Sequence, residues 1–212
     1  HNTPVVLLSD GYLGNGAEPW KIKSIKDMPD ISPNIAYEGE KYEPYLRNNK
    51  TLSRKLALPG TKGLEHTIGG LEKEDVTGNV SYEPENHEKM CKIRSEKIKR
   101  IANIIPQQIV FGEEKGELLV IGWGGTYGSL YCAVENLLNR KESIALCQFN
   151  YINPLPKNTK EILNNYKKIV VCELNSGQFA NYLRINFQGT IFNQYNKIQG
   201  FPFTVSELEL HF

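Results

Sequence analysis

The sequence lacks a marked excess of charge of either sign. Its 25 basic and 24 acidic residues leave a formal net charge of +1 at pH 7, and lysine and glutamate are interspersed along the chain. Nucleic acids and anionic membranes are bound by concentrated basic patches. The sequence also lacks an apolar run near the roughly 20 residues that cross a bilayer, and no signal peptide opens it. We therefore predict a globular, cytoplasmic protein that binds neither nucleic acid nor membrane.

Cysteine and histidine are scarce, with four residues of each. No C-x-x-C pair is present, and His66 and His87 do not form an H-x-x-x-H pattern, so the spacings typical of metal sites are missing. Free cysteine in apolar segments behaves as a small hydrophobic residue. We therefore predict buried thiols and no metal site. The four cysteines are Cys91, Cys132, Cys147 and Cys172.

Regular patterning is present from Gly116 onward. Strand-like runs at 118–122, 143–147 and 169–173 recur every 25 or 26 residues, each followed by a turn and a helical stretch. This spacing is typical of βαβ units in a parallel sheet with helices on both faces. A fourth strand at about 189–194 and a terminal helix from about Thr204 complete the predicted domain. The fold class is α/β, doubly wound and mainly parallel.

Two of the predicted helices begin with possible capping boxes. Asn158 is followed three residues later by Glu161, and Asn175 is followed by Gln178 in the same way. Asn175 and Gln178 also follow the strand that ends at Glu173, where side chains of α/β proteins face a ligand crevice; capping is the interpretation we favour. The first helix has an apolar face made of Tyr127, Leu130, Tyr131, Val134, Leu137 and Leu138.

The first part of the chain has a different character. A strand-like run at 4–9 opens the sequence without a neighbouring element to pair with, as in a piece cut from a longer protein. Residues 10–82 are aperiodic and rich in glycine and proline, which favours an extended linker held against another domain. Residues 84–105 read as one helix, with acids early and bases late, as the helix dipole favours. Its apolar stripe consists of Met90, Ile93, Ile98, Ile101 and Ile105.

A glycine-rich turn joins the first strand of the regular part to its helix. The stretch 122–128 reads GWGGTYG, and a dinucleotide fingerprint starting at Gly122 would need glycine where Tyr127 stands. Free N–H groups at a helix start favour an anion, so Gly124, Gly125 and Thr126 are weak candidates for one. Close helix packing or a subunit contact is the alternative that we favour, because glycine also allows close approach.

Several longer motifs resemble one known family. They are PVVLLSDGYLGNGAEPWKI at 4–22, LALPGTKGLEHTIGGLEKEDVTGNVSYEPENHEKM at 56–90, IGWGGTYG at 121–128, INPLPKN at 152–158, CELNSGQ at 172–178 and IQGFPFTVSELE at 198–209. Together they are similar to the C-terminal half of the alpha subunit of 2-oxoglutarate (2-oxoacid):ferredoxin oxidoreductase. This enzyme cleaves a 2-oxoacid and makes an acyl-CoA, using thiamine diphosphate and iron–sulfur clusters.

The resemblance implies a domain organisation. Residues 1–25 would be the last strand and exit of a pyrimidine-binding domain, 26–106 an extended linker with a connecting helix, and 107–212 a domain similar to the C-terminal domain of transketolase. Thiamine diphosphate, Mg²⁺ and Fe4S4 would be held elsewhere in the complex, with no catalytic residue in this chain and no cofactor bound by it. The implied partners are the beta subunit, the missing N-terminal part of the alpha chain, ferredoxin and CoA. By itself the chain is expected to be inactive.

The resemblance also implies a substrate-facing loop, in which an arginine holds the substrate carboxylate. The matching stretch points to Arg54, with Thr61 as a hydrogen-bond donor and Lys55 as an alternative to Arg54. The functional alternatives are a stand-alone nucleotide- or CoA-binding module, based on the glycine turn, and a non-catalytic interaction domain that forms a homodimer through an exposed edge at 4–9.

Overall fold

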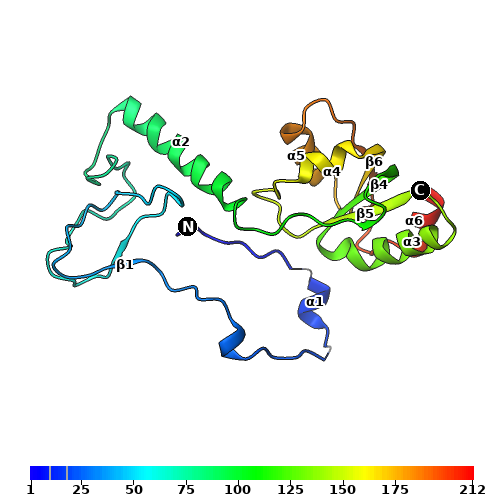
Figure 1. The fold of residues 1–212 in the computed structure, drawn as a ribbon, viewed down its shortest axis with the longest axis horizontal. Helices are drawn as coiled ribbons and strands as arrows, with labels where there is room; N and C mark the ends of the chain where they lie inside the picture. Colours follow the sequence, from blue (N-terminus) through cyan, green and yellow to red (C-terminus); the bar gives the residue numbers. More distant parts are fainter. Residues whose placement is uncertain (10, 18) are drawn as a thin grey trace. The chain divides into compact units, whose positions relative to one another are not determined.

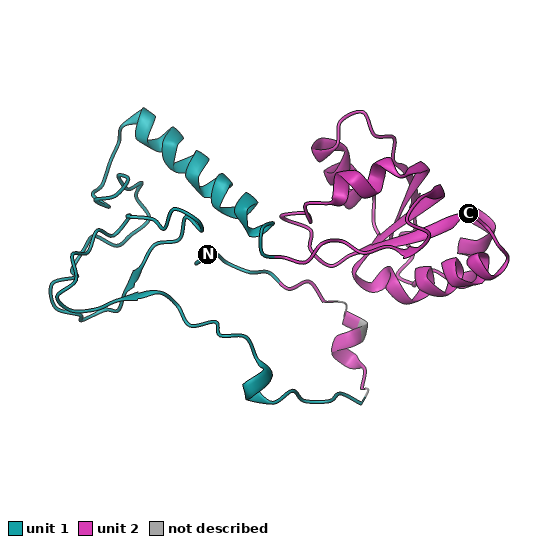
Figure 2. Cartoon of the chain, in the orientation of Figure 1, with its two compact units in different colours: residues 1–6, 18–104 teal, residues 7–17, 105–212 magenta. Residues whose placement is uncertain are grey.

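The computed structural model describes residues 1–9, 11–17 and 19–212. The chain forms two compact units (Figure 2): residues 1–6 with 18–104, and residues 7–17 with 105–212. Asp10 and Glu18 fall within the predicted domain remnant 1–25, but they lie outside the described residues. No described helix is both long enough and apolar enough to cross a membrane.

The second unit is built on a five-stranded sheet in the order β3-β5-β4-β6-β7. Its strands β4, β5 and β6 are labelled in Figure 1. The strands β4, β5, β6 and β7 run parallel to their neighbours, and only the short β3 pairs antiparallel with β5. Their bounds are β3 Phe111–Gly112, β4 Gly116–Trp123, β5 Ile144–Phe149, β6 Tyr166–Glu173 and β7 Asn193–Asn196. The predicted mainly parallel sheet is confirmed.

Helices cover both faces of this sheet. Successive residues of a strand point to opposite faces, and in β4 Leu119 and Ile121 join one buried cluster while Val120 joins the other. The first cluster contains apolar residues of α4 (Thr159–Asn164) and α5 (Gln178–Asn186), and the second contains those of α3 (Tyr127–Asn139) and α6 (Val205–His211). The doubly wound arrangement is therefore confirmed. It explains why the central strands read as continuous apolar runs.

The last strand begins later than predicted. The expected strand spanned 189–194, whereas β7 spans Asn193–Asn196 and pairs with β6 from Val170 to Glu173. Gly189 has a φ of +87°, which belongs to a turn rather than to extended backbone. The chain therefore completes its turn after α5 before it reaches the edge of β6.

Neither predicted capping box forms. Asn158 precedes α4, but its amide pairs with the backbone of Gln108, accepting from N at 2.9 Å and donating to O at 2.8 Å. The helix α5 begins at Gln178 rather than at Asn175. The Asn175 Oδ1 atom accepts from the N–H groups of Gly177 and Gln178, at 2.8 and 3.3 Å, and so closes the turn just before the helix. An Asn side chain can hydrogen-bond to several backbone groups near it. Asn158 binds the backbone of Gln108, which is distant in sequence, and Asn175 binds the turn that follows it.

The first unit has little regular structure apart from one helix. It contains η1 (Ile25–Asp27), the two-residue parallel strands β1 (Ile35–Ala36) and β2 (Leu56–Ala57), and α2 (Pro84–Ile101). The helix α1 (Gly11–Asn15) is grouped with the second unit. The predicted helix 84–105 is thus correct in its start and too long at its end. After Ile101 the backbone tightens into turns, in which Asn103 N donates to Arg100 O and Ile104 N to Ile101 O, each at 3.0 Å, and Pro106 disfavours helical backbone at Ile105. Met90 of α2 is 1% exposed and, with Leu64 and Ala36, belongs to the few buried apolar residues of this unit.

The strand-like run that opens the chain forms no strand with the described residues. Residues 4–9 form no ladder with any described residue, and Val5, Leu7 and Leu8 are exposed by 66–89%. A β-branched, apolar run has the composition of a strand, but a strand needs a neighbour that accepts and donates its ladder hydrogen bonds.

Candidate functional site

A pocket in the first unit collects the residues of the predicted substrate-facing loop. It has a volume of about 310 Å³ and is lined by Tyr42, Tyr45, Arg54, Lys55, His66 and Lys73, among others. The rings of Tyr42 and His66 meet edge to face with centroids 5.4 Å apart, and His66 Nδ1 lies 2.9 Å from the Leu64 carbonyl oxygen. The pocket therefore combines aromatic walls with several basic side chains.

Arg54 is held in this pocket by an aromatic ring and a carbonyl. Its guanidinium carbon lies 4.1 Å from the centroid of the Tyr45 ring, and Nη1 donates to the Pro44 carbonyl at 3.2 Å. No described carboxylate forms an ion pair with Arg54. A guanidinium stacked on a ring keeps its edge free for a planar, bidentate partner such as a carboxylate.

The neighbouring candidates have different surroundings. Lys55 forms an ion pair with Glu40 at 2.5 Å, so its charge is already compensated. Thr61 is half-buried in a turn, where its N–H donates to the Leu58 carbonyl at 3.1 Å, and it is not among the residues that line the pocket. The geometry therefore favours Arg54 over Lys55 as a ligand of an anion, and it does not bring Thr61 to the same pocket.

Glu72 directly precedes the pocket residue Lys73 and links this segment to the helix α2. Arg94 donates to both of its carboxylate oxygens, at 3.1 and 3.3 Å, and His87 Nδ1 lies 2.7 Å from Oε2. These hydrogen bonds, first from Arg94 and then from His87, lower the pKa of Glu72 to about 2. The carboxylate thus stays ionised and ties the segment before Lys73 to α2.

A pH dependence follows from this network. The pKa of Glu72 falls from 4.5 to about 2 on folding, so the stabilisation is complete above pH 4.5 and is lost as the pH falls towards 2. Because these ion pairs are partly exposed, we expect Glu72→Gln to lower the free energy of unfolding at pH 7 by less than about 1 kcal/mol. Urea unfolding of both proteins between pH 7 and pH 2 should show this difference vanishing at the acid end. A difference that grows on acidification would contradict the assignment.

The glycine turn of the second unit is occupied by its own side chains. After β4, residues Gly124–Thr126 form η2, in which Thr126 Oγ1 accepts from Trp123 N at 3.2 Å and donates to Trp123 O at 2.9 Å. Gln148 donates to the Gly124 carbonyl at 3.2 Å, while its Oε1 is buried without a partner among the described residues. The partial negative charge of this unpaired Gln148 oxygen would repel an anion bound at the turn. A Cβ on Gly122 would lie 2.3 Å from Leu130 Cδ1. These contacts favour packing over anion binding at Gly124, Gly125 and Thr126.

The end of β6 carries a buried carboxylate whose role the sequence did not show. Glu173 is 0% exposed. Its Oε1 accepts from Trp123 Nε1 at 3.2 Å and from Phe179 N at 2.8 Å, and its Oε2 accepts from Ala180 N at 3.0 Å. The N–H groups at the start of α5 therefore have a negative partner from within the chain. Glu173 does not face a ligand crevice; it joins β4, β6 and α5.

Two of the four cysteines are buried and two are exposed. Cys147 and Cys172 are buried, as predicted, and burial raises the pKa of both thiols well above its usual range, so they stay protonated. Cys91 and Cys132 are exposed, and the prediction of buried thiols was wrong for them because they lie on outward faces of α2 and α3. Within the described residues, no three His, Cys, Asp or Glu side chains gather as a metal site would require.

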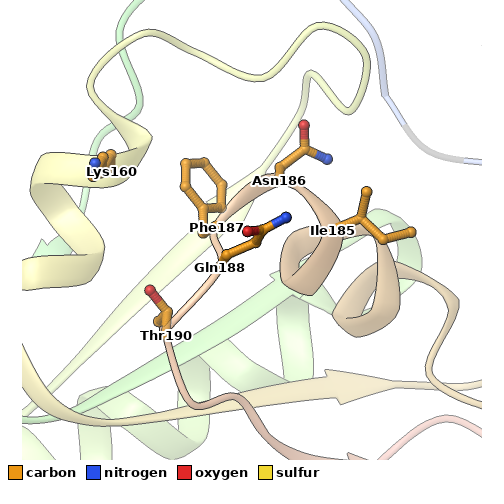
Figure 3. Close-up of a pocket in the computed structure, with 6 residues that line it drawn as sticks. All are labelled: Lys160, Ile185, Asn186, Phe187, Gln188 and Thr190. Carbon is orange, nitrogen blue, oxygen red and sulfur yellow. The ribbon is translucent and has the colours of Figure 1, made fainter.

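A pocket of the second unit is lined by few side chains that could catalyse a reaction or bind a charged ligand. Its volume is about 360 Å³, and Figure 3 shows its lining residues, which are Lys160 of α4 and Ile185, Asn186, Phe187, Gln188 and Thr190 at the end of α5. Lys160 is its one titratable lining residue. A single exposed lysine beside amides and a threonine forms neither a nucleophile–base pair nor a cofactor site.

Comparisons with known proteins identify relatives over nearly the whole chain. No protein-family model matches. The chain is 40% identical over 208 residues to the 2-oxoglutarate oxidoreductase subunit KorA of Mycobacterium tuberculosis, a match covering 98% of this chain and 32% of that protein. It is 30% identical over 193 residues to the 2-oxoacid:ferredoxin oxidoreductase subunit alpha of Saccharolobus solfataricus, covering 88% of this chain and 30% of that protein.

A solved structure shows the same fold. It is the 2-oxoglutarate:ferredoxin oxidoreductase of Magnetococcus marinus, with a TM-score of 0.80, 24% sequence identity, and coverage of 89% of this chain and 33% of that one. The chain thus spans about a third of the length of its relatives. Over almost all of its residues, it is similar to one part of the alpha subunits of these two oxidoreductases.

Proposed function

We propose that the chain is part of the alpha subunit of a thiamine-diphosphate-dependent 2-oxoacid:ferredoxin oxidoreductase. The enzyme would convert 2-oxoglutarate, CoA and oxidised ferredoxin to succinyl-CoA, CO2 and reduced ferredoxin. The observation that carries this proposal is the 40% identity over 208 residues to a subunit named for 2-oxoglutarate oxidation. The stand-alone nucleotide- or CoA-binding module has less support, because the contacts at the glycine turn favour packing.

Within such an enzyme, this chain would contribute subunit docking and a substrate-facing loop. We assign residues 107–212 to the domain similar to the C-terminal domain of transketolase, 26–106 to the linker and 1–25 to the end of the pyrimidine-binding domain. The partners would be the beta subunit and the rest of the alpha chain, with ferredoxin and CoA acting on the complex in the cytoplasm.

The cofactors would be held outside this chain. Thiamine diphosphate with Mg²⁺ and an Fe4S4 cluster would supply the carbon–carbon cleavage and the electron transfer. An Fe4S4 cluster needs several thiolates together, whereas Cys147 and Cys172 are buried in the sheet and Cys91 and Cys132 belong to different units. The described residues therefore do not fit the cluster, and no electron-transfer step is assigned to them.

Arg54 would bind the carboxylate of the 2-oxoacid. Its guanidinium has a fixed stacking partner in Tyr45 and no ion-pair partner among the described residues. A bidentate pair with the carboxylate would orient the carbonyl carbon of the substrate for attack, and positioning of this kind lowers the barrier. Thr61 remains predicted as an additional hydrogen-bond donor, supported by the resemblance alone.

The proposal can be tested in a chimeric enzyme. The segment of the M. tuberculosis subunit that aligns with this chain is replaced by this chain and co-expressed with the beta subunit. We expect CoA-dependent reduction of a viologen dye when 2-oxoglutarate is added. An assembled but inactive chimera would contradict the proposal.

In the same chimera, Arg54→Gln is expected to raise the KM for 2-oxoglutarate by about tenfold or more, the effect of losing one charge-assisted hydrogen-bonded contact. Lys62→Met is the matched control, because Lys62 is exposed and does not line the pocket, so its loss should leave KM nearly unchanged. Equal effects of both changes would argue against a specific role for Arg54.

A further inference from the structure

Four side chains of the first unit form a cluster around an exposed thiol. Cys91 lies on α2, about one turn after His87 and one turn before Arg94. Its Sγ atom lies 3.7 Å from His87 Nε2 and accepts from Arg94 Nη2 at 3.1 Å. Glu72, in the loop before the helix, binds both His87 and Arg94. Residues three and four apart are neighbours on a helix surface, so the thiol, the imidazole and the guanidinium are presented together.

The carboxylate of Glu72 determines which nitrogen of His87 carries the proton. His87 Nδ1 lies 2.7 Å from Glu72 Oε2, and an ionised carboxylate can only accept a hydrogen bond. Nδ1 is therefore the donor, and in the neutral ring Nε2 is left as the acceptor. Because Nε2 is the ring nitrogen beside Cys91, it can take the proton of the thiol. Carboxylate, imidazole and thiol thus stand in the order of an orienting group, a base and its nucleophile.

Arg94 places a fixed positive charge at the sulfur. Its two terminal nitrogens donate to the two oxygens of Glu72, at 3.1 and 3.3 Å, and this bidentate pair sets the plane of the guanidinium. The Nη2 atom that reaches Cys91 Sγ is therefore held in place, and it would stabilise the negative charge on sulfur once the proton has moved. A base and a cation beside a solvent-exposed thiol are the surroundings of reactive cysteines.

Two observations limit the chemistry of this thiol. Cys91 is the only cysteine of the first unit, so no second thiol of that unit can form a disulfide with it. Neither of the two pockets described above is lined by Cys91. An ester or amide substrate needs a binding site and donors for its oxyanion as well as a nucleophile, whereas a small disulfide needs only access to a thiolate.

We propose that Cys91 is a modification site, which reacts with disulfides of small thiols and becomes a mixed disulfide. The thiol proton passes to His87 Nε2, and Sγ attacks one sulfur atom of the disulfide. A new S–S bond forms as the old one breaks, and the departing thiolate takes the proton back from Nε2. Cys91 is oxidised while the released thiol is reduced, so no other oxidant is consumed. The inference is independent of the proposed function, because no residue of the cluster has a role there.

The reaction rates of the two exposed cysteines provide the first test. Unlike Cys91, Cys132 has no hydrogen-bonded base or cation among the described residues. Dipyridyl disulfide is the probe, because it is uncharged and releases an absorbing thione. In the full chain, Cys132→Ser leaves Cys91 as the exposed thiol, and Cys91→Ser leaves Cys132. We expect Cys91 to react about tenfold faster or more at pH 7, since the rate follows the fraction of thiolate. Equal rates would overturn the proposal.

Variants of the cluster test the role of each neighbour in the Cys132→Ser background. His87→Gln and Arg94→Met should each slow Cys91 by several-fold to about tenfold. Lys92→Met is the matched control, because it removes a positive charge from the same helix but pairs with Glu88 and not with the sulfur; it should leave the rate unchanged. If Lys92→Met slowed Cys91 as much as Arg94→Met, a general charge effect would replace the proposed contact.

The pH profile of the rate separates activation of the sulfur from a change in its accessibility. A change in accessibility scales the rate equally at every pH, whereas loss of the base or of the cation moves the rise of the rate to higher pH. We expect this displacement for His87→Gln and for Arg94→Met. A profile that keeps its position in both variants would show that the cluster only shapes the surface of the helix.

Exposure of the wild-type chain to oxidised glutathione tests the modification itself. Mass spectrometry of the digested chain should find the mixed disulfide on Cys91, with Cys132 modified several-fold less, and dithiothreitol should remove it. Modification of both cysteines to the same extent, or of Cys132 alone, would overturn the proposal.

Discussion

Replacing Glu173 by alanine is expected to lower the free energy of unfolding of the parallel-sheet unit by about 3–5 kcal/mol, because three N–H donors would lose their acceptor at roughly 1–3 kcal/mol each. The carboxylate is fully buried and accepts three hydrogen bonds. Alanine would leave the Trp123 indole N–H and two backbone N–H groups at the start of α5 without an acceptor. Buried donors that lose their partners cost more than the hydrogen bonds themselves contribute. It would also leave a cavity between β4, β6 and α5.

The measurement is denaturant unfolding followed by the fluorescence of Trp123 in a Trp20→Phe background, since Trp20 belongs to the first unit. Glu161→Ala is the matched control: it removes a glutamate from the first turn of α4, where Glu161 is exposed, and its loss should stay within about 0.5 kcal/mol. Glu173→Gln keeps one acceptor oxygen, and its effect should fall between the two. If Glu173→Ala were as mild as the control, the network would not hold the sheet and helix together.

The second large effect is expected at the glycine turn, where two glycines six positions apart should respond with opposite signs. A Cβ at position 122 would lie 2.3 Å from Leu130 Cδ1, 2.6 Å from Gln148 Oε1 and 2.9 Å from Thr126 Oγ1. Because Leu130 is fully buried, it cannot move aside freely. Gly122→Ala should therefore lower the free energy of unfolding by about 1–3 kcal/mol, the usual cost of overpacking.

Gly128 lies in the first turn of α3, and a Cβ there would meet nothing within 4 Å. Alanine at this position should raise the free energy of unfolding by roughly 0.5–1 kcal/mol, because glycine is the poorer helix former. Both variants are compared with the wild type in the same unfolding assay. A loss of similar size at both positions would mean that the turn as a whole, and not close packing at Gly122, demands glycine.

Hydrophobic pattern and spacing were sufficient to predict the centre of the sheet. The runs at 118–122, 143–147 and 169–173 lie inside β4, β5 and β6, apart from Ser143, which directly precedes β5. A strand buried on both faces leaves a local mark, namely a short continuous apolar run that recurs with the length of a βαβ unit. At residues 4–9 the composition of a strand is present, but the described chain provides no neighbour for it and no strand forms.

Polar residues were the less predictable part of the site. Asn158 has the sequence position of a helix cap, yet its amide pairs with Gln108, fifty residues away. Glu173 was noticed as the end of a strand, but its role as the acceptor for α5 depends on where that helix starts. The position of Arg54 was predicted from a family resemblance, and only the tertiary structure stacks its guanidinium on Tyr45 while Lys55 pairs with Glu40.

The sequence by itself determined the order of helices and strands in residues 116–173, the parallel sheet and the relationship to oxidoreductase alpha subunits. These features are carried by local periodicity and by contiguous motifs. Only the tertiary structure decided that Glu173 is an internal cap and that Lys73 is a buried cation beside Arg54. A charge is paired or left alone by the groups that folding brings within about 4 Å of it, and Lys73 has three acids close in sequence that all pair elsewhere.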